Sequence, residues 1–202
     1  MQPFSLSAQE IVLEPLTPGD APAVAEYCVD PLFETYMATP WPYTLADAEA
    51  FTGEYAPEAW RTDAEWTWAI REHAGGQLLG VIGLRLPSGM LGFWLGAPHR
   101  GRRIMSAAVD AVVRAAFEQT ELDAVLWEAR VGNVASARTV ERSGFTHTGT
   151  APGSILGRDG ETVHSWTARL TRVAFRMGSA LSMPDSRLSG IHNADPIRNA
   201  SP

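Results

Sequence analysis

The chain has 202 residues, 45% of them hydrophobic and 19% charged, a composition typical of one globular domain with a core of its own. The single cysteine, Cys28, has no partner for a disulfide within the chain, and no Cys/His spacing resembles a zinc site. No apolar stretch reaches the ~20 residues that span a bilayer. The net charge of −7 argues against general nucleic-acid binding, which needs a basic face. Since no basic and apolar leader is visible either, the sequence predicts a cytoplasmic protein without membrane, nucleic-acid or metal partners.

Charge is distributed unevenly along the chain. Residues 1–72 carry 13 acidic and two basic side chains, whereas residues 73–202 carry 10 acidic side chains and 14 arginines. The chain has no lysine, so every basic residue is arginine. The first part therefore favours cations and the second tolerates anions. An acidic surface that only keeps the protein in solution is the alternative explanation for the first part.

The N-terminal elements are predicted from short patterns. Residues 9–16 alternate like a first strand. Pro18-Gly-Asp20 is typical of a helix start, with Asp20 as the N-cap, and residues 31–43 are aromatic and loop-like. Thr44 caps a further helix, in which Asp47 supplies the acid of a capping box.

The rest of the chain alternates strands and helices. Hairpin turns and period-two patterns predict strands at 64–72, 78–86, 90–96, 124–131, 146–149 and 161–170. Amphipathic helices are expected at 106–120 and 134–143, the second ending before Gly144. This order predicts an α/β fold, a mixed central sheet of six to seven strands with helices on both faces.

The C-terminal segment differs in composition. Residues 178–202 are rich in Ser, Pro, Asn and Asp and show no periodicity, which predicts a flexible tail after one domain at 1–177. An arm that packs on the partner subunit of a homodimer is the alternative.

Two segments predict an anion site. Phe93 to Met105 runs from an apolar strand through an arginine-rich turn into a helix, and Asn133 to Ser136 opens the next helix after one strand. A strand, a basic turn and a helix N-terminus bind anions because free backbone N–H groups and the helix dipole converge there.

The chain from Gln9 to Leu170 resembles the GNAT acyltransferases, and within them the RimJ/RimL-type N-acetyltransferases. Each motif is weak alone, but their order and spacing together are specific. The motifs are Trp41-Pro-Tyr43-Thr44, Asp47-Ala-Glu49-Ala-Phe51, Trp68-Ala-Ile70, Leu79-Gly-Val-Ile-Gly-Leu84, Gly92-Phe-Trp-Leu95, His99-Arg-Gly-Arg102, Asn133-Val-Ala-Ser136 and Glu141-Arg-Ser-Gly-Phe145. The resemblance implies the GNAT fold and transfer of an acetyl group from acetyl-CoA to a primary amine, by direct attack in a ternary complex.

The resemblance also implies which residues bind coenzyme A. The family's pyrophosphate turn has Arg or Gln, two free positions, Gly, one free position, and Gly or Ala. Here Arg100 and Gly101 fit, Arg103 stands in place of Gly, and Met105 in place of a small residue. Arg103 either adds a phosphate ligand to a working site, offering its N–H at negative φ, or marks a degraded one. The implied cofactor residues are Phe93, Trp94, Leu95, Arg100, Gly101, Arg102, Arg103, Ile104, Met105, Asn133 and Ser136.

Catalytic groups are harder to assign. Asn133 is an N-cap that the resemblance places on the pantetheine arm, with Ser136 near the thioester sulfur; a strand N–H next to Trp94 or Leu95 is expected to polarise the thioester carbonyl. Many relatives have a Tyr acid seven residues after the Asn, where this chain has Val140, so Ser136 is the candidate proton donor.

The general base has several candidates. Strand 90–96 contains no acid, which leaves Glu128 as the candidate base, with a structural Glu128–Arg130 pair as the alternative. His99, at the phosphate turn, is expected to be structural or phosphate-facing, and the role of His164 is open. Water chains alone are a further alternative, in which the enzyme binds the small neutral fraction of the amine.

The acceptor is the least specified part. The loop with Trp41 and Tyr43 resembles the family's acceptor wall, and a plain packing loop is the alternative. Beside the acidic residues 1–72 it would suit a cationic acceptor, with a protein N-terminal α-amine expected first and a small amine such as a polyamine or aminoglycoside second. A non-catalytic acyl-CoA-binding regulatory module and a transferase of succinyl or another acyl group are the alternative functions.

Overall fold

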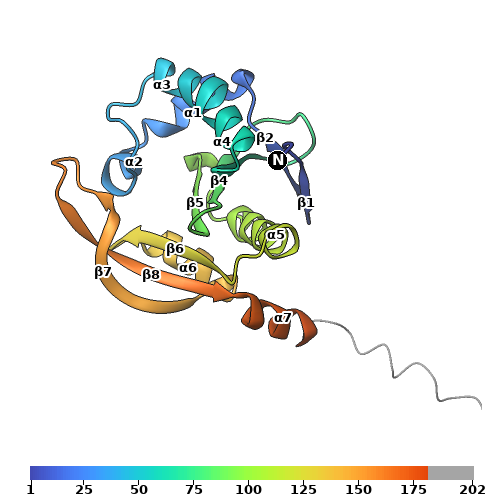
Figure 1. Cartoon of the computed structure of the whole chain (residues 1–202). Coiled ribbons are helices and arrows are strands. Elements are labelled where there is room, and N and C mark those ends of the chain that lie inside the picture. The colour runs from blue at the N-terminus through green and yellow to red at the C-terminus, as the bar shows by residue number, and fades with distance from the viewer. Residues whose placement is uncertain (182–202) are drawn as a thin grey trace, which may run out of the picture.

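The structure is a computed structural model and describes residues 1–181. Its centre is an eight-stranded sheet with the order β1-β2-β3-β4-β5-β6-β8-β7 (Figure 1). The strands are β1 (Leu6–Ala8), β2 (Ile11–Pro15), β3 (Glu65–Arg71), β4 (Gly80–Arg85), β5 (Met90–Leu95), β6 (Ala124–Arg130), β7 (Thr146–Leu156) and β8 (Thr162–Thr171). The mixed α/β class is confirmed, with eight strands where six to seven were expected.

Helices cover both faces of this sheet (Figure 1). They are α1 (Ala21–Cys28), α2 (Pro31–Tyr36), α3 (Leu45–Ala50), α4 (Ala56–Arg61), α5 (Ile104–Gln119), α6 (Val134–Arg142) and α7 (Arg172–Leu181), with single turns η1 (Pro18–Asp20), η2 (Phe51–Tyr55) and η3 (Ala97–His99). No helix among residues 1–181 is long and apolar enough to cross a membrane.

Alternation along the central strands divides the core into two layers. Trp68 of β3 and Ile82 of β4 are fully buried with residues of α5. Their neighbours Ala69 and Val81 point to the opposite face, where they pack with α1 and α3. Because successive side chains of a strand face opposite sides, two buried faces require these strands to be apolar throughout. β3 is accordingly buried from Trp66 to Arg71.

The sheet separates at its centre. In the described sheet, β5 and β6 are the one parallel pair, and they pair only at Met90–Leu126 and Leu91–Trp127. Beyond these two positions β5 remains paired with β4, and β6 remains paired with β8. The edge of β5 that faces β6 is therefore unpaired from Gly92 to Leu95, which leaves backbone groups free to bind a ligand.

Several predicted boundaries differ from the structure. Residues 9–16, predicted as one strand, follow a turn at Gln9 (φ 51°) that separates β2 from the additional strand β1. Residues 31–43, predicted as a loop, contain α2. Asp20 is not the predicted side-chain cap of α1: its carboxylate accepts the N–H and hydroxyl of Thr17 and pairs with Arg71. The burial of Arg71 makes that pairing necessary.

Other expectations are met at the ends of elements. The Thr44–Asp47 capping box is present, and α6 is followed by Gly144 at φ 83°. β7 extends well beyond the predicted strand at 146–149. α7 continues across the predicted domain boundary at residue 177, and residues 182–202 of the predicted tail lie outside the described part of the chain.

Candidate active site

A cavity of about 560 Å³ opens where β5 and β6 separate. Five segments line it: α2, the end of β5, the turn that follows Arg100, the start of α5, and the start of α6 with the residues before it. Two helix N-termini therefore converge on one end of the cavity, while the side of α2 forms the other. Helix N-termini carry a partial positive charge, so the first end favours an anion.

The start of α5 offers unsatisfied donors. The first intrahelical hydrogen bond of α5 runs from the Ala107 N–H to the Arg103 carbonyl (3.2 Å). Among the described residues, the N–H groups of Ile104, Met105 and Ser106 have no protein acceptor. Gly101 precedes them at φ 77°, a left-handed conformation that glycine adopts without strain. The predicted pyrophosphate turn thus has the geometry of an anion-binding loop.

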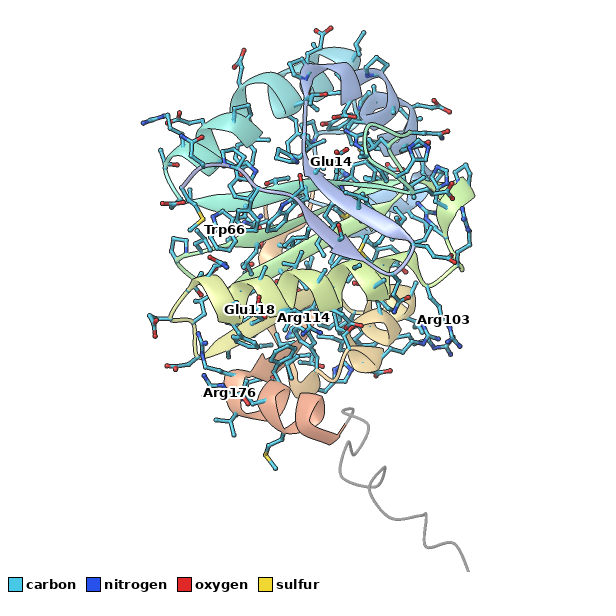
Figure 2. The ribbon with its side chains drawn as sticks, turned by 90° about the vertical axis from the view of Figure 1, so that its right-hand side faces the viewer. Glu14, Trp66, Arg103, Arg114, Glu118 and Arg176 are labelled. Atoms are coloured by element: carbon cyan, nitrogen blue, oxygen red, sulfur yellow. The ribbon has the colours of Figure 1, made fainter. Side chains whose placement is uncertain are left out.

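Arg103 differs from the expectation of negative φ. It adopts φ 61° and ψ 8°, the left-handed conformation, at the N-cap of α5. This conformation costs an L-residue about 1–2 kcal/mol and costs glycine almost nothing, which explains the glycine of the family pattern. The Arg103 side chain is exposed at the end of α5 opposite Glu118 (Figure 2). The turn therefore keeps its shape despite the arginine, under strain.

The arginines of the turn differ in their partners. Arg100 Nη1 lies 2.8 Å from Asp30 Oδ2, and Arg100 Nε donates to the Leu95 carbonyl (3.1 Å). Asp30 is also the N-cap of α2, so Arg100 joins the turn to that helix. Arg102 instead pairs with Glu72 (2.6 Å) and does not line the cavity. The Arg102 side chain is therefore used outside the cavity, and its contact with the cofactor stays a prediction.

The structure adds two arginines that the sequence analysis missed. Arg138 and Arg142 lie one turn apart on α6 and line the cavity with Arg103. Within the described residues, none of these three guanidinium groups forms an ion pair. The i, i+4 spacing in the predicted helix 134–143 was the available signal. The cavity therefore holds positive charge beyond that of the turn.

Asn133 and Ser136 lie where the sequence predicted. Asn133 caps α6, and its Oδ1 accepts the Ser136 N–H (3.2 Å). The Trp127 indole N–H of β6 donates to Ser136 Oγ (3.1 Å). Because this bond uses an acceptor site of the hydroxyl, the Ser136 O–H remains available to donate. Both residues line the cavity.

Glu128 has a different environment. Its Oε1 accepts the N–H groups of Ser154 (2.7 Å) and Ile155 (3.1 Å), and its Oε2 accepts the Ser154 hydroxyl (2.9 Å). β7 is irregular here, and Gly153 approaches so closely that a Cβ would lie 2.4 Å from Glu128 Oε1. Glu128 does not line the cavity, so it anchors the bulge of β7 in the structure.

The alternative Glu128–Arg130 pair is absent among the described ion pairs, so that interpretation was wrong. Arg130 donates to the backbone carbonyls of Thr35 and Leu156 instead. The C-terminus of α2 thereby gains a cation, which suits the negative end of a helix.

His99 is structural, one of its two expected roles. Its Nε2 lies 3.0 Å from the Tyr27 hydroxyl in the interior. Burial, and secondly the positive Arg102, lower the pKa of His99 below 6.5, so its ring is neutral at pH 7. Neither His99 nor His164 lines the cavity.

The predicted acceptor residues Trp41 and Tyr43 lie outside the cavity lining. Tyr43 is buried in the core layer under α1 and α3, and the Trp41 ring lies 5.7 Å below the Arg158 guanidinium. Arg158 also donates to the carbonyls at the end of α2 and of Thr39. These contacts fit the packing-loop alternative.

The side of α2 lines the cavity instead. Apolar and aromatic side chains of α2 and of its C-cap line the cavity together with Trp94 of β5; they are Leu32, Phe33, Tyr36 and Met37. The Phe33 and Trp94 rings meet edge to face, with centroids 5.4 Å apart. Sequence reasoning missed this helix, although Asp30 followed by Pro31 is a helix-start signal.

Comparison with known proteins agrees with this geometry. A family model described as an acetyltransferase (GNAT) domain matches residues 10–146. The chain therefore belongs to the GNAT acetyltransferase family. The Bacillus subtilis protein YjcK, named a probable N-acetyltransferase, is 29% identical over 115 residues, 54% of this chain. The chain spans about 63% of the length of that relative.

Solved structures show the same fold at low identity. RimJ of Mycobacterium smegmatis, with a CoA-disulfide, is 17% identical at a TM-score of 0.74, over 88% of this chain and 95% of its own. RimL, a ribosomal α-N-protein acetyltransferase in complex with coenzyme A, is 15% identical at a TM-score of 0.69, over 85% of this chain and 99% of its own. The microcin C7 self-immunity acetyltransferase MccE, in complex with acetyl-CoA and AMP, is 18% identical at a TM-score of 0.68, over 81% of this chain and 93% of its own. The expected likeness to the RimJ/RimL type is thus confirmed in fold.

Proposed function

We propose that this chain transfers an acetyl group from acetyl-CoA to a primary amine. The observation that carries the proposal is the cavity itself. It joins the unpaired edge of β5 to the free N–H groups at the start of α5. An extended, amide-containing arm that ends in a pyrophosphate matches these two features, because the amides can bond to a strand edge and the phosphates to a helix N-terminus.

The residues present fit that donor. The N–H groups of Ile104 to Ser106 and the Arg103 guanidinium would hold the pyrophosphate, with Arg138 and Arg142 available to the remaining phosphate. The β5 edge over Phe93 to Leu95 would bond the pantetheine arm, and Asn133 lies across from it. The unusual Arg103 keeps the turn in shape, which favours a working site over a degraded one.

The chemistry follows from the groups at the centre of the cavity. The lone pair of a neutral amine attacks the thioester carbonyl carbon, the C–S bond breaks, the acylated nitrogen loses one proton to water, and coenzyme A leaves as a thiolate that gains one proton. Ser136 is the proposed donor of that proton; it lines the cavity, and the Trp127 bond to its oxygen leaves its O–H free to donate. A β5 N–H near Trp94 or Leu95 would polarise the carbonyl.

The two candidate acceptors keep the ranking proposed from the sequence. A protein N-terminal α-amine is the first candidate and a small amine the second, in a cytoplasmic enzyme whose homodimeric state stays a prediction. Incubation with acetyl-CoA and a panel of amines, with detection of free thiol, tests the proposal. Thiol release that depends on the amine supports it.

Two other results would identify the alternative functions. Tight coenzyme A binding by calorimetry without thiol release would indicate a non-catalytic acyl-CoA-binding module. A higher kcat/KM with succinyl-CoA than with acetyl-CoA would indicate a different acyl donor, held by the additional arginines.

A further inference from the structure

The charged groups of the cavity all have the same sign. Four arginines line it, at positions 100, 103, 138 and 142, and Tyr36 is the one other titratable side chain in the described lining. No aspartate or glutamate belongs to that lining. An acceptor amine therefore meets no carboxylate there, either as a counter-ion or as a proton acceptor.

The acidic residues of the first third of the chain are used elsewhere. Asp20 pairs with Arg71, Asp30 pairs with Arg100, and Glu72 pairs with Arg102. Glu58 and Glu65 likewise pair with Arg61 and Arg85 on the surface away from the cavity lining. These five carboxylates thus pair with arginines, and none of the 13 acidic residues of residues 1–72 belongs to the cavity lining.

The titratable groups around the cavity do not change this balance. On β6, both oxygens of Glu128 accept hydrogen bonds from β7, and Arg130 is bound to the end of α2. On α1 and η3, Tyr27 and His99 bond to each other outside the lining. On α2, Glu34 is exposed and outside the lining, so the titratable groups of the lining itself are neutral or positive.

The acceptor end is also apolar. Leu32 and Phe33 of α2, its C-cap Met37 and Trp94 of β5 form its surface, and Leu32 remains 48% exposed although it is a large apolar residue. Desolvation beside apolar groups, with no carboxylate in the lining to compensate for it, disfavours an ammonium ion and favours a neutral amine. The same surface would gain free energy by covering an alkyl or aryl group of the acceptor.

We propose that the acceptor is a weakly basic amine carried next to an apolar group, such as the α-amine of a peptide with an apolar first residue, and that it enters the cavity already neutral. This inference rests on the proposed function. It excludes polyamines and aminoglycosides, which the acidity of residues 1–72 had suggested. It also makes an enzyme base unnecessary for activating the amine, because solvent removes the ammonium proton before binding, and the proton that the nitrogen loses on acylation passes to water.

Basicity then determines which amines react. At about pH 7.5, about one-third of a peptide α-amine is neutral, against about 0.1% of a lysine-like alkyl amine, given their pKa values of about 7.8 and 10.4. The greater nucleophilicity of the more basic amine offsets part of this ratio. We therefore expect kcat/KM at this pH to favour the α-amine by about 10- to 300-fold.

Two acceptors with the same benzyl group separate basicity from shape. Phenylalaninamide carries a weakly basic α-amine, and phenethylamine carries a strongly basic one. With thiol release measured from pH 6 to 9.5, kcat/KM for phenylalaninamide should level off near pH 8, while that for phenethylamine should still rise at pH 9.5. An enzyme base would make both profiles level off at the same pH, and that result would overturn the inference.

A carboxylate added to the acceptor wall should reverse the preference. Leu32→Glu places one beside the cavity, and Leu45→Glu is a matched control at the start of α3, because Leu45 is 49% exposed and outside the lining. We expect Leu32→Glu to lower kcat/KM for phenylalaninamide and raise it for spermidine at least fivefold relative to the control. Equal ratios in the two variants, or wild-type preference for spermidine over phenylalaninamide, would contradict the inference. Absence of thiol release with every amine would instead refute the proposed function, and the inference with it.

Discussion

Replacement of Arg103 by glycine should stabilise the protein and weaken its binding of coenzyme A at the same time. Arg103 sits at φ 61°, where an L-residue pays about 1–2 kcal/mol that glycine does not pay. Glycine in turn loses more conformational entropy on folding, which lowers the free energy of unfolding by about 0.5–1 kcal/mol. The difference predicts a net stabilisation of about 0.5–1 kcal/mol, or a rise of about 1–4 °C in the Tm of the ligand-free protein.

The binding effect has the opposite sign because the Arg103 guanidinium lines the cavity without a partner among the described residues. One exposed charge facing a phosphate contributes about 0.5–1 kcal/mol, so Arg103→Gly should raise the Kd of coenzyme A about two- to fivefold. High salt should shrink this difference, because exposed charges are screened.

Two control variants separate the backbone effect from the charge effect. Arg103→Lys keeps the charge and the strain, so both Tm and Kd should stay near those of the wild type. Arg103→Asn removes the charge but tolerates left-handed backbone better than arginine, so it should follow the glycine variant with a smaller gain in Tm. Thermal unfolding of the ligand-free variants and calorimetry with coenzyme A measure the two effects. A glycine variant no more stable than the wild type would refute the strain argument, and tighter binding would show that Arg103 obstructs the phosphate.

Four further predictions concern other residues of the site and its support. Ser136→Ala should lower kcat by roughly ten- to a thousandfold with little change in the Kd of coenzyme A, as expected for a proton donor; an unchanged kcat excludes that role. Arg138→Ala should raise the Kd of coenzyme A, more at low salt than at high salt, whereas Arg169→Ala on the exposed face of β8 should not; equal effects would argue against a phosphate contact. Gly153→Ala should destabilise the fold by about 1–3 kcal/mol in chemical unfolding, because its Cβ would lie 2.2 Å from the nearest hydroxyl oxygen; wild-type stability would mean that the bulge of β7 yields easily. Stability should fall as the pH drops below 6.5, since the unfolded chain binds a proton that buried His99 resists, and this dependence should flatten in His99→Gln.

The predictable part of the fold is the part with periodic sequence. Strands β3 to β6 and helices α5 and α6 were predicted within a few residues, because buried faces impose a period of two or 3.6 on their apolar residues. α2 was missed because six residues are too few to show a period, so that only the Asp30 cap and Pro31 indicated it. The strand β1 was missed because its three residues merge with the pattern of β2.

The site was predictable where chemistry is local. The arginine-rich turn before α5 and the Asn133 cap follow from consecutive residues, and both lie where they were expected; phosphate binding by the turn stays a prediction. Glu128 could not be assigned from sequence, because its donors come from a bulge in β7 whose register no pattern reveals. The sign of φ at Arg103 is set by how α5 packs on the sheet, which the turn sequence does not contain.

The way in which α2 is held has a consequence for the order of events in the site. Its first turn is tied to the phosphate turn through Asp30 and Arg100, and its last turn is tied to β6 and the β7–β8 hairpin through Arg130 and Arg158. A phosphate that competes for Arg100 would therefore act on α2, the proposed acceptor wall. Donor and acceptor affinities are then thermodynamically linked, each changing the other by the same factor. Initial-rate patterns with both substrates varied should show that linkage as a KM for the amine that depends on the donor concentration.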